Sequence, residues 1–386
     1  MNINKVLIIG SGTMGSGIAA QVANAGINVV LLDLPSKEGD RNEIVNKAKE
    51  RILKSRPSLL VDKDKINLIT SGNIEDNFNL VAEADWVVEA VVERIDIKHN
   101  IYKKIEKIRK KDSIISSNTS TIPLKILSEK MSDEMKKNFC ITHFFNPVRY
   151  MGLLEIVTEP INNKENISLL RSFCDEKLGK GVIICNDTPG FLGNRVGVYA
   201  MQVAMTEAFK MGLTIEEADA VFGRPMGIPK TGVFGLYDLI GIDLMADVLK
   251  SFLKELPKED LFHEVAQENP FITKMIEQGY TGRKGKGGFY RMNKEGQKRI
   301  LESINLKTGE YSPSQKINLE IGDKLNINNL IYRNDIYGKY AWSVISQIIN
   351  YASSLIPEVT KEHNNIDEAM RLGFNWTKGP FEIFDD

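Results

Sequence analysis

Two titratable side chains stand in otherwise apolar segments and could act as an acid–base pair. His143 follows the run 139–142, and Glu155 interrupts the apolar run 153–157. An imidazole with an unperturbed pKa of about 6.5 can accept the proton of a secondary alcohol near neutral pH. A buried carboxylate is costly unless it is paired, and pairing with a histidine on the neighbouring strand would orient the ring. The pattern predicts a catalytic base and its partner. The alternative is a structural histidine of the core, whose hydrogen bonds are satisfied by its neighbours and which has no catalytic role.

A glycine-rich turn directly follows the first predicted strand and opens a helical pattern. Gly10, Gly12 and Gly15 form it, with Thr13 and Met14 in between. The first glycine permits the tight turn, the second lets the backbone approach a pyrophosphate, and the third lets the helix pack closely on the strand. The helix N-terminus then offers unpaired N–H groups to the anion. We therefore expect these five residues to bind a dinucleotide.

Asp33 ends the second predicted strand, 29–32, beyond the glycine turn. A carboxylate about 20 residues past such a turn can accept both ribose hydroxyl protons of the adenosine. It would repel a 2′-phosphate, so the sequence favours NAD over NADP. The alternative is a solvated turn residue.

Uncharged polar side chains stand where they could complete the pocket. Asn118 and Ser120 lie in the run 116–121 after another predicted strand, and Asn194 follows the Pro-Gly turn at 189–190. Hydroxyl and amide groups can hydrogen-bond ligand oxygens without adding charge. We expect Asn118 to contact the cofactor, and Ser120 and Asn194 to contact the substrate. The alternatives are helix-capping chemistry for the serine run and an ordinary helix N-terminal residue for Asn194.

These residues need a sheet whose strand ends meet at one edge. From residue 5 to about residue 185, short β-branched runs alternate with longer helical patterns, as in βαβ units around a parallel sheet. The predicted strands cover residues 6–9, 29–32, 86–89, 113–116, 139–142, 154–157 and 182–184. The predicted fold class is α/β, with a doubly wound Rossmann-type sheet whose strand ends border the ligand crevice.

After residue 187 the pattern changes to helical periodicity, without convincing strands up to about residue 280. Residues 291–329, rich in Lys, Asn and Ser, predict an extended connection with little core of its own. We expect an NAD-binding domain at 1–187, a helical domain at 188–300, a linker at 301–330 and a second, truncated helical repeat at 331–386.

An approximate internal repeat underlies this division. The shared residues are Asp219, Gly227 and Asp238 in one segment and Asp367, Gly373 and Asp385 in the other. The two aspartates of each segment are separated by nearly the same length of chain, which predicts a duplicated all-helical unit. The alternative is two unrelated helical hairpins with similar turns.

Charge and cysteine content exclude several classes of protein. With 50 Lys and Arg against 51 Asp and Glu, broad electrostatic capture of nucleic acid or an anionic membrane is not expected. The three cysteines are scattered among apolar neighbours, which predicts buried thiols in a reducing compartment and no metal site. The apolar run near the N-terminus, within residues 5–9, is too short for the apolar region of a signal peptide, and no apolar stretch approaches the ~20 residues of a membrane span. We expect a cytoplasmic location.

Four sequence blocks together resemble the (3S)-3-hydroxyacyl-CoA dehydrogenase family of fatty-acid β-oxidation. They are residues 10–17 (GSGTMGSG), 89–93 (EAVVE), 117–120 (SNTS) with 143–147 (HFFNP), and 187–195 (DTPGFLGNR). The resemblance extends over essentially the whole chain, including the duplicated helical domain. It is closest to the long fused form, in which a dehydrogenase half precedes an enoyl-CoA hydratase half.

The resemblance implies NAD-dependent oxidation of the 3-hydroxyl of an acyl-CoA thioester, in β-oxidation or butanoate metabolism. It implies that His143 and Glu155 are the catalytic pair, that Ser120 and Asn194 orient the substrate, and that Asn146 lines the same pocket. It also implies a homodimer or an association with an enoyl-CoA hydratase domain or subunit.

The same resemblance implies further cofactor contacts. Ala90, Glu93 and Lys98 match positions beside the nicotinamide ribose, and Asp33 matches the adenosine ribose contact.

The sequence departs from the family pattern in two places. Gly152 stands where many members carry lysine, and the basic segment 47–56 does not align clearly with the family's coenzyme A contacts. Lys49, Lys54 and Arg56 are candidates for those contacts, although a charge run on a helix is usually a solvated face.

Two other functions fit parts of the pattern. One is a dehydrogenase for a small hydroxy acid or sugar acid, which would use the same cofactor half. The other is a catalytically idle NAD-binding scaffold, against which the complete set of polar site residues speaks.

Overall fold

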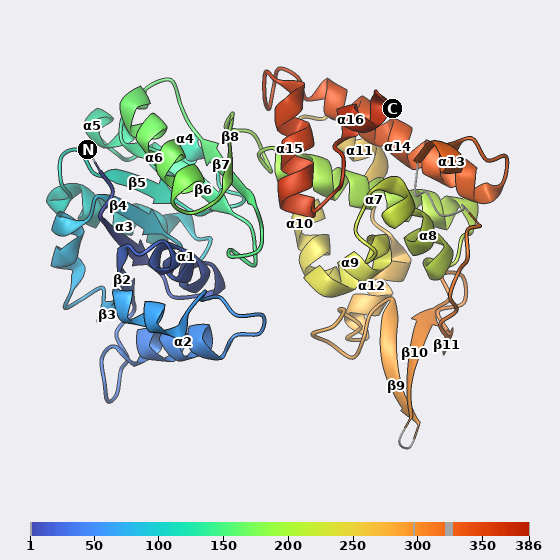
Figure 1. The fold of residues 1–386 in the computed structure, drawn as a ribbon, viewed down its shortest axis with the longest axis horizontal. Helices are drawn as coiled ribbons and strands as arrows, with labels where there is room; N and C mark the ends of the chain where they lie inside the picture. The colour runs from blue at the N-terminus through green and yellow to red at the C-terminus, as the bar shows by residue number, and fades with distance from the viewer. Residues whose placement is uncertain (1, 296–297, 321–326, 386) are drawn as a thin grey trace. The chain divides into compact units, whose positions relative to one another are not determined.

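The computed structural model describes residues 2–295, 298–320 and 327–385. The chain forms two compact units (Figure 1). The first comprises Met1–Leu192 with Glu358–Thr360, and the second comprises Gly193–Pro357 with Lys361–Asp386. Among the described residues, no helix combines the length and apolar character needed to cross a bilayer.

The first unit is built on an eight-stranded sheet in the order β3-β2-β1-β4-β5-β6-β7-β8. The strands are β1 Lys5–Ile9, β2 Asn28–Asp33, β3 Ile69–Asn73, β4 Trp86–Glu89, β5 Ile114–Ser117, β6 Phe139–Phe144, β7 Leu153–Val157 and β8 Gly181–Cys185. The chain crosses from β3 over β2 and β1 to β4, so the sheet is doubly wound and the predicted Rossmann-type fold is confirmed.

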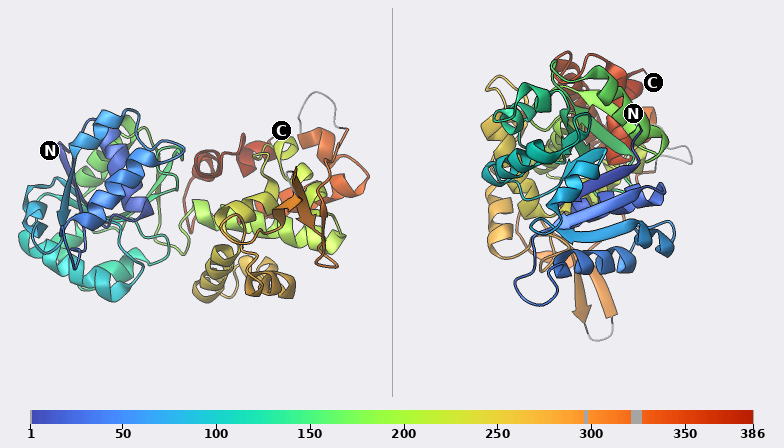
Figure 2. Two further views of the ribbon diagram at one scale, coloured as in Figure 1. Left: turned by 90° about the horizontal axis from the view of Figure 1, so that it is seen from below. Right: turned by 90° about the vertical axis from the view of Figure 1, so that its left-hand side faces the viewer.

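Helices cover both faces of this sheet (Figure 2). They are α1 Thr13–Asn24, α2 Glu43–Lys54, α3 Ile95–Ile108, α4 Leu124–Ser128, α5 Asp133–Lys136 and α6 Lys164–Glu176, with 3-10 turns η1 Lys63–Leu68 and η2 Phe78–Glu83. The apolar faces of α1, α2 and α6 share one core cluster with alternate residues of the central strands. The strands themselves are almost wholly buried because helices pack on both sides of them.

Two details of the sheet differ from the prediction. Strand β3 was missed because its sequence, ITSGN, lacks the β-branched, apolar run that predicts a strand. Strands β6 and β7 are antiparallel, whereas the other neighbouring strands described in this sheet are parallel. A parallel crossover needs about a dozen residues or more, and residues 145–152 are too few, so the chain turns straight back.

The second unit is mainly helical, as predicted. Its helices are α7 Gly193–Met211, α8 Ile215–Val221, α9 Gly232–Ile240, α10 Ile242–Glu255, α11 Phe262–Val265, α12 Pro270–Glu277, α13 Ile327–Ile331, α14 Ile336–Ser354, α15 His363–Phe374 and α16 Pro380–Phe384, with a 3-10 turn η3 Arg224–Met226. Helix α7 is buried along most of its length and contacts α14 and α15. It therefore forms the centre of this unit.

The extended connection predicted for residues 291–329 is wrong over its first part. The strands β9 Tyr290–Glu295, β10 Lys298–Ile304 and β11 Tyr311–Pro313 form an antiparallel sheet. Arg291 and Glu302 face each other across β9 and β10 at 2.7 Å, and the Arg291 guanidinium lies 3.8 Å from the ring centroid of Tyr311. Polar pairs across strands can stabilise a sheet without the apolar alternation from which strands are predicted in a sequence. Residues 321–326 of the predicted connection lie outside the described residues.

The two repeated segments make the same local contact. The Asp219 carboxylate accepts hydrogen bonds from the backbone N–H groups of Phe234 (2.7 Å) and Gly235 (3.1 Å) at the start of α9. Asp367 accepts one from Phe381 N–H (2.8 Å) at the start of α16. Each aspartate thus caps the short helix that follows it, which supports the predicted duplication; the boundaries 188–300, 301–330 and 331–386 stay a prediction.

Burial raises the pKa of Asp219 to about 7, despite its backbone hydrogen bonds. A carboxyl whose pKa is higher in the folded than in the unfolded state stabilises the fold when protonated. This contribution is full below about pH 4 and is lost as the pH rises through about 7. In the unsubstituted protein, this group should lower the free energy of unfolding by at most about 1.4 kcal/mol for each pH unit of increase over this range. We predict that the Asp219→Asn variant lacks this contribution. Urea unfolding of both proteins at several pH values measures it, and parallel pH profiles would contradict the prediction.

Candidate active site

His143 and Glu155 lie directly opposite each other on β6 and β7. Their Nδ1 and Oε2 atoms are 2.7 Å apart, and the side chains are 7% and 0% exposed. Because an ionised carboxylate can only accept hydrogen bonds, Nδ1 must carry a proton. The predicted pairing of the two residues is therefore present, and it leaves Nε2 as the ring nitrogen that can exchange a proton with a ligand.

The segment before α7 completes the surroundings of this pair. Glu155 Oε1 accepts a hydrogen bond from Leu192 N–H at 3.0 Å. The His143 ring lies 4.5 Å from the ring of Phe145 and 5.5 Å from that of Phe191, measured between centroids. Phe191 has a φ of 51°, a left-handed conformation that is unfavourable for a bulky side chain. Such strain is retained where surrounding contacts impose it, and here it places Phe191 against the imidazole.

The glycine turn has the geometry that a dinucleotide needs. Gly10 has a φ of +104°, and a Cβ there would lie 2.4 Å from the Ala90 carbonyl oxygen. A Cβ on Gly15 would lie 1.8 Å from the Gly10 carbonyl oxygen, so neither position tolerates a side chain. A Cβ on Gly12 would meet no described atom within 4 Å, and none of the described side chains caps the N-terminus of α1. The backbone N–H groups around Thr13 and Met14 are thus open to a pyrophosphate.

Asp33 lies at the carboxyl end of β2, beside this turn. Its Oδ2 accepts hydrogen bonds from the backbone N–H and the hydroxyl of Ser11, both at 2.6 Å, and its Oδ1 accepts one from Leu34 N–H at 2.7 Å. A carboxylate has about four acceptor sites, so a fixed acceptor remains for a ribose hydroxyl. A cavity of about 440 Å³ begins here. It is lined by Ile9, Gly10, Gly12, Asp33, Leu34, Ile74, Ala90, Val91, Val92, Ile97, Asn100, Ile101 and Lys104.

A second buried carboxylate, Glu89, ends β4 at the same edge of the sheet. Its oxygens accept hydrogen bonds from four donors: Lys98 Nζ (2.8 Å), Val91 N–H (2.8 Å), Tyr102 Oη (2.5 Å) and Ser117 Oγ (2.7 Å). Glu89 and Lys98 are 0% and 1% exposed. The pair ties α3 to the ends of β4 and β5, and the sequence reasoning missed it.

The network continues from Lys98 to the surface. Lys98 Nζ also lies 3.2 Å from Glu93 Oε2, and Glu93 Oε1 accepts a hydrogen bond from Ser120 N–H at 3.1 Å. Glu93 and Lys98, expected to contact the cofactor, and Ser120, expected to contact the substrate, are therefore linked within one unit.

Both units match known family models. Residues 5–188 match the model described as 3-hydroxyacyl-CoA dehydrogenase, NAD binding domain, and residues 190–292 match the 3-hydroxyacyl-CoA dehydrogenase C-terminal domain. The chain belongs to the 3-hydroxyacyl-CoA dehydrogenase family. Its dinucleotide is therefore NAD, which the open glycine turn and Asp33 can accommodate.

Individual relatives agree with this family. A Rickettsia felis protein named as a fatty acid oxidation complex trifunctional enzyme is 44% identical over 99% of this chain and 53% of its own length. A Deinococcus radiodurans protein named as a 3-hydroxyacyl-CoA dehydrogenase is 40% identical over 80% of this chain and 88% of its own length. The structure of 3-hydroxybutyryl-CoA dehydrogenase from Escherichia coli has the same fold, with a TM-score of 0.76 at 23% identity over 98% of this chain and 90% of that one. The chain spans about half the length of the first two curated relatives that it matches, which it covers to 53% each.

The other residues that the 3-hydroxyacyl-CoA dehydrogenase resemblance implied have varied surroundings. Asn118 Oδ1 accepts a hydrogen bond from Phe144 N–H at 3.0 Å and so joins β5 to β6 beside His143. Asn146 is exposed and precedes a cis peptide bond to Pro147. Asn194 is the second residue of α7 and belongs to the helical unit.

The two departures from the family pattern can also be placed. The Lys180 ammonium, 3% exposed, donates hydrogen bonds to the carbonyl oxygens of Val148 and Met151, and burial lowers its pKa to about 8. A buried cation thus holds the turn before Gly152, although it comes from the residue that precedes β8. In the basic segment, Lys49 Nζ donates to the Ile69 carbonyl at 2.5 Å and Lys54 pairs with Glu50 at 3.0 Å.

The Glu89–Lys98 pair yields a stability prediction. Removing one partner of a buried ion pair typically costs about 3–5 kcal/mol because the other charge stays buried. We predict that Glu89→Gln lowers the free energy of unfolding by about this amount. Glu93→Gln, whose side chain is 41% exposed, should lower it by less than about 1 kcal/mol. Urea unfolding of the two variants measures the difference. Equal losses would show that Glu89 is not the principal counter-ion of Lys98.

Proposed function

We propose that this chain catalyses the NAD-dependent oxidation of (3S)-3-hydroxyacyl-CoA to 3-ketoacyl-CoA in fatty-acid β-oxidation or butanoate metabolism. The observation that carries the proposal is the 2.7 Å contact between His143 Nδ1 and Glu155 Oε2. It fixes the orientation of the imidazole and leaves Nε2 as the base. The name of the Deinococcus radiodurans relative, 3-hydroxyacyl-CoA dehydrogenase, supports this choice of reaction.

In the proposed reaction, His143 Nε2 takes the proton of the substrate 3-hydroxyl while the hydride of C3 leaves. Bound NAD supplies the hydride acceptor. The C3–H and O–H bonds break, a C=O double bond forms, and the imidazole becomes an imidazolium. The Glu155 carboxylate stabilises that charge, since a nearby opposite charge favours the protonated form of a base. The reverse reaction uses the same proton.

The remaining site residues have proposed roles that follow the resemblance. Ser120 and Asn194 orient the substrate, and Asn146 lines its pocket. On the cofactor side, the backbone at Gly10, Gly12, Thr13, Met14 and Gly15 holds the pyrophosphate and Asp33 the adenosine ribose. Ala90, Glu93, Lys98 and Asn118 border the nicotinamide half.

We also propose that the chain works beside an enoyl-CoA hydratase domain or subunit, or as a homodimer. The name of the Rickettsia felis relative, a trifunctional enzyme of which the chain covers 53%, supports the first arrangement. A cytoplasmic location is proposed as well. Cys140, Cys174 and Cys185, all within the described residues, are buried free thiols, which suits a reducing compartment.

Substitution of the base tests the mechanism. His143→Gln should bind NAD normally but lose about 10²- to 10⁴-fold in turnover of acetoacetyl-CoA with NADH, because a general base or acid typically contributes that much. The decrease in NADH absorbance measures turnover, and protein fluorescence quenching measures NAD binding. His363→Gln, which changes an exposed histidine of the helical unit, is the matched control. Unchanged turnover of the His143 variant would remove this residue from the mechanism.

A substrate series tests the reaction class. We expect NADH-dependent reduction of 3-ketoacyl-CoA esters and at least a hundredfold lower kcat/KM with free acetoacetate, because binding energy from the remote coenzyme A contributes to the rate. Equal turnover of the free acid would favour a small hydroxy-acid dehydrogenase. NAD binding without turnover of any ester would favour the scaffold.

A further inference from the structure

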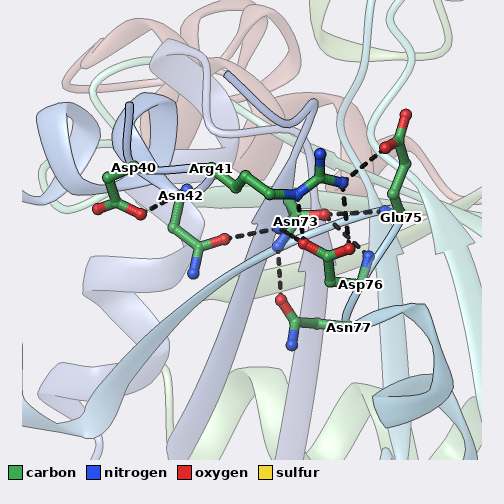
Figure 3. A network of polar contacts seen from close by, with 7 residues as sticks. All are labelled: Asp40, Arg41, Asn42, Asn73, Glu75, Asp76 and Asn77. Carbon is green, nitrogen blue, oxygen red and sulfur yellow. Dashed lines mark hydrogen bonds and ion pairs between the residues drawn. The ribbon is translucent and has the colours of Figure 1, made fainter. Parts of the chain in front are cut away.

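A network of polar residues lies just beyond the carboxyl ends of β2 and β3 (Figure 3). Arg41 stands in the connection between β2 and α2, and its guanidinium points at two acids that follow β3. It donates two hydrogen bonds to Asp76, at 2.6 and 3.0 Å, and one to Glu75 at 2.7 Å. These contacts raise the pKa of the guanidinium and lower that of the Asp76 carboxyl, so the Arg41–Asp76 pair is charged.

The side chain of Asn73 hydrogen-bonds to the segment that carries Glu75 and Asp76. It is 1% exposed, and its Oδ1 accepts hydrogen bonds from the backbone N–H groups of Glu75 (3.0 Å) and Asp76 (2.9 Å). Its Nδ2 donates to Asp76 Oδ2 at 2.9 Å and to Asn42 Oδ1 at 2.8 Å. The acids are thus presented to Arg41 by a buried amide. Exposed ion pairs are weak individually, but a bidentate pair on a fixed support has a defined geometry.

This network adjoins the adenosine ribose position. Asp33 and Asn73 are register partners at the carboxyl ends of β2 and β3, and Ile74 N–H donates to the Asp33 carbonyl at 2.9 Å. Ile74 and Leu34 line the cavity together with Asp33. The acids at 75 and 76 therefore begin one residue beyond the cavity wall.

Charge is what distinguishes the two dinucleotides at this end. NADP carries an additional 2′-phosphate, which proteins usually bind with arginine, while NAD presents only hydroxyls. Arg41 is a cation of this kind in the loop after Asp33, but its guanidinium is already hydrogen-bonded to the carboxylates of Glu75 and Asp76. A second guanidinium, that of Arg51 on α2, donates to the Ser11 carbonyl at 3.2 Å.

We propose that Glu75 and Asp76 are specificity-determining residues that withhold Arg41 from a 2′-phosphate, so that the choice of NAD depends on these acids as well as on Asp33. Removal of the Asp33 carboxylate alone then leaves the site poor for NADP. Neutralising the two acids frees a guanidinium in the loop that follows Asp33. The proposal concerns cofactor choice only and is independent of the substrate oxidised.

The test measures binding of NADP and NAD to the full chain by quenching of protein fluorescence, without any turnover. Asp33→Ser should weaken NAD binding and leave NADP binding poor. Adding Glu75→Gln and Asp76→Asn should strengthen NADP binding roughly ten- to a hundredfold, the range expected for a hydrogen bond to a charged group. Adding Arg41→Met to that triple variant should abolish the gain. Destabilisation cannot mimic a gain in affinity that depends on one arginine.

Three results would overturn the proposal. The first is that Asp33→Ser already binds NADP as tightly as the triple variant does. The second is that the triple variant keeps its gain in NADP affinity after Arg41→Met is added. The third is that this gain is lost when Arg51→Met is added instead. Adding only Asp76→Asn to Asp33→Ser, which replaces one of the two Asp76 oxygens that accept from Arg41 and removes the charge, should give a smaller gain in the same direction. Circular dichroism shows whether the triple variant folds. If it does not, the variant with fewer substitutions serves as the test.

Discussion

The hydrogen bond between His143 and Glu155 depends on the reversal of the chain between β6 and β7. In an antiparallel pair, residues in register face each other across the ladder, and their side chains lie on the same face of the sheet. The carboxylate is fully buried, and the imidazole and the Leu192 N–H each contact one of its oxygens, which offsets the cost of burying it. The second of these donors requires the unusual turn at Phe191. The short connection between β6 and β7 therefore places the pair, and the segment that follows β8 supplies a further donor to the buried carboxylate.

The same constraint recurs at Glu89. Its four donors come from α3, from the end of β5 and from the backbone after β4. A buried carboxylate saturated in this way orders every element that supplies a donor, since a missing donor would leave an uncompensated charge. Glu93 and Ser120 lie at the outer end of this network, so residues proposed to meet cofactor and substrate are held by the interior of the same unit. Catalytic geometry benefits from such support because small displacements lower the rate steeply.

Much of the fold could be predicted because its determinants are local. Seven strands of the main sheet have β-branched runs, and the glycine turn is recognisable because a predicted strand precedes it and a helical pattern follows it. Strand β3 could not be predicted, because its pairing with β2 stabilises it rather than its own composition. The extended connection predicted at 291–329 is wrong over its first part because the contacts that stabilise the sheet there, such as the pair Arg291–Glu302, join residues on different strands. Both errors concern elements whose stability comes from partners elsewhere in the chain.

The sequence by itself determined the residue types of the site: glycines where a Cβ would collide with backbone, an acid at the end of β2, and a histidine and a glutamate within apolar strands. These choices leave a trace in the sequence because a side chain is either forbidden or costly at each position. Only the tertiary structure decided that β7 runs antiparallel to β6, that Lys98 is paired with Glu89, and that Arg41 is held by Glu75 and Asp76. Those outcomes depend on which surfaces meet, and a charged residue in a sequence does not say which opposite charge will compensate it.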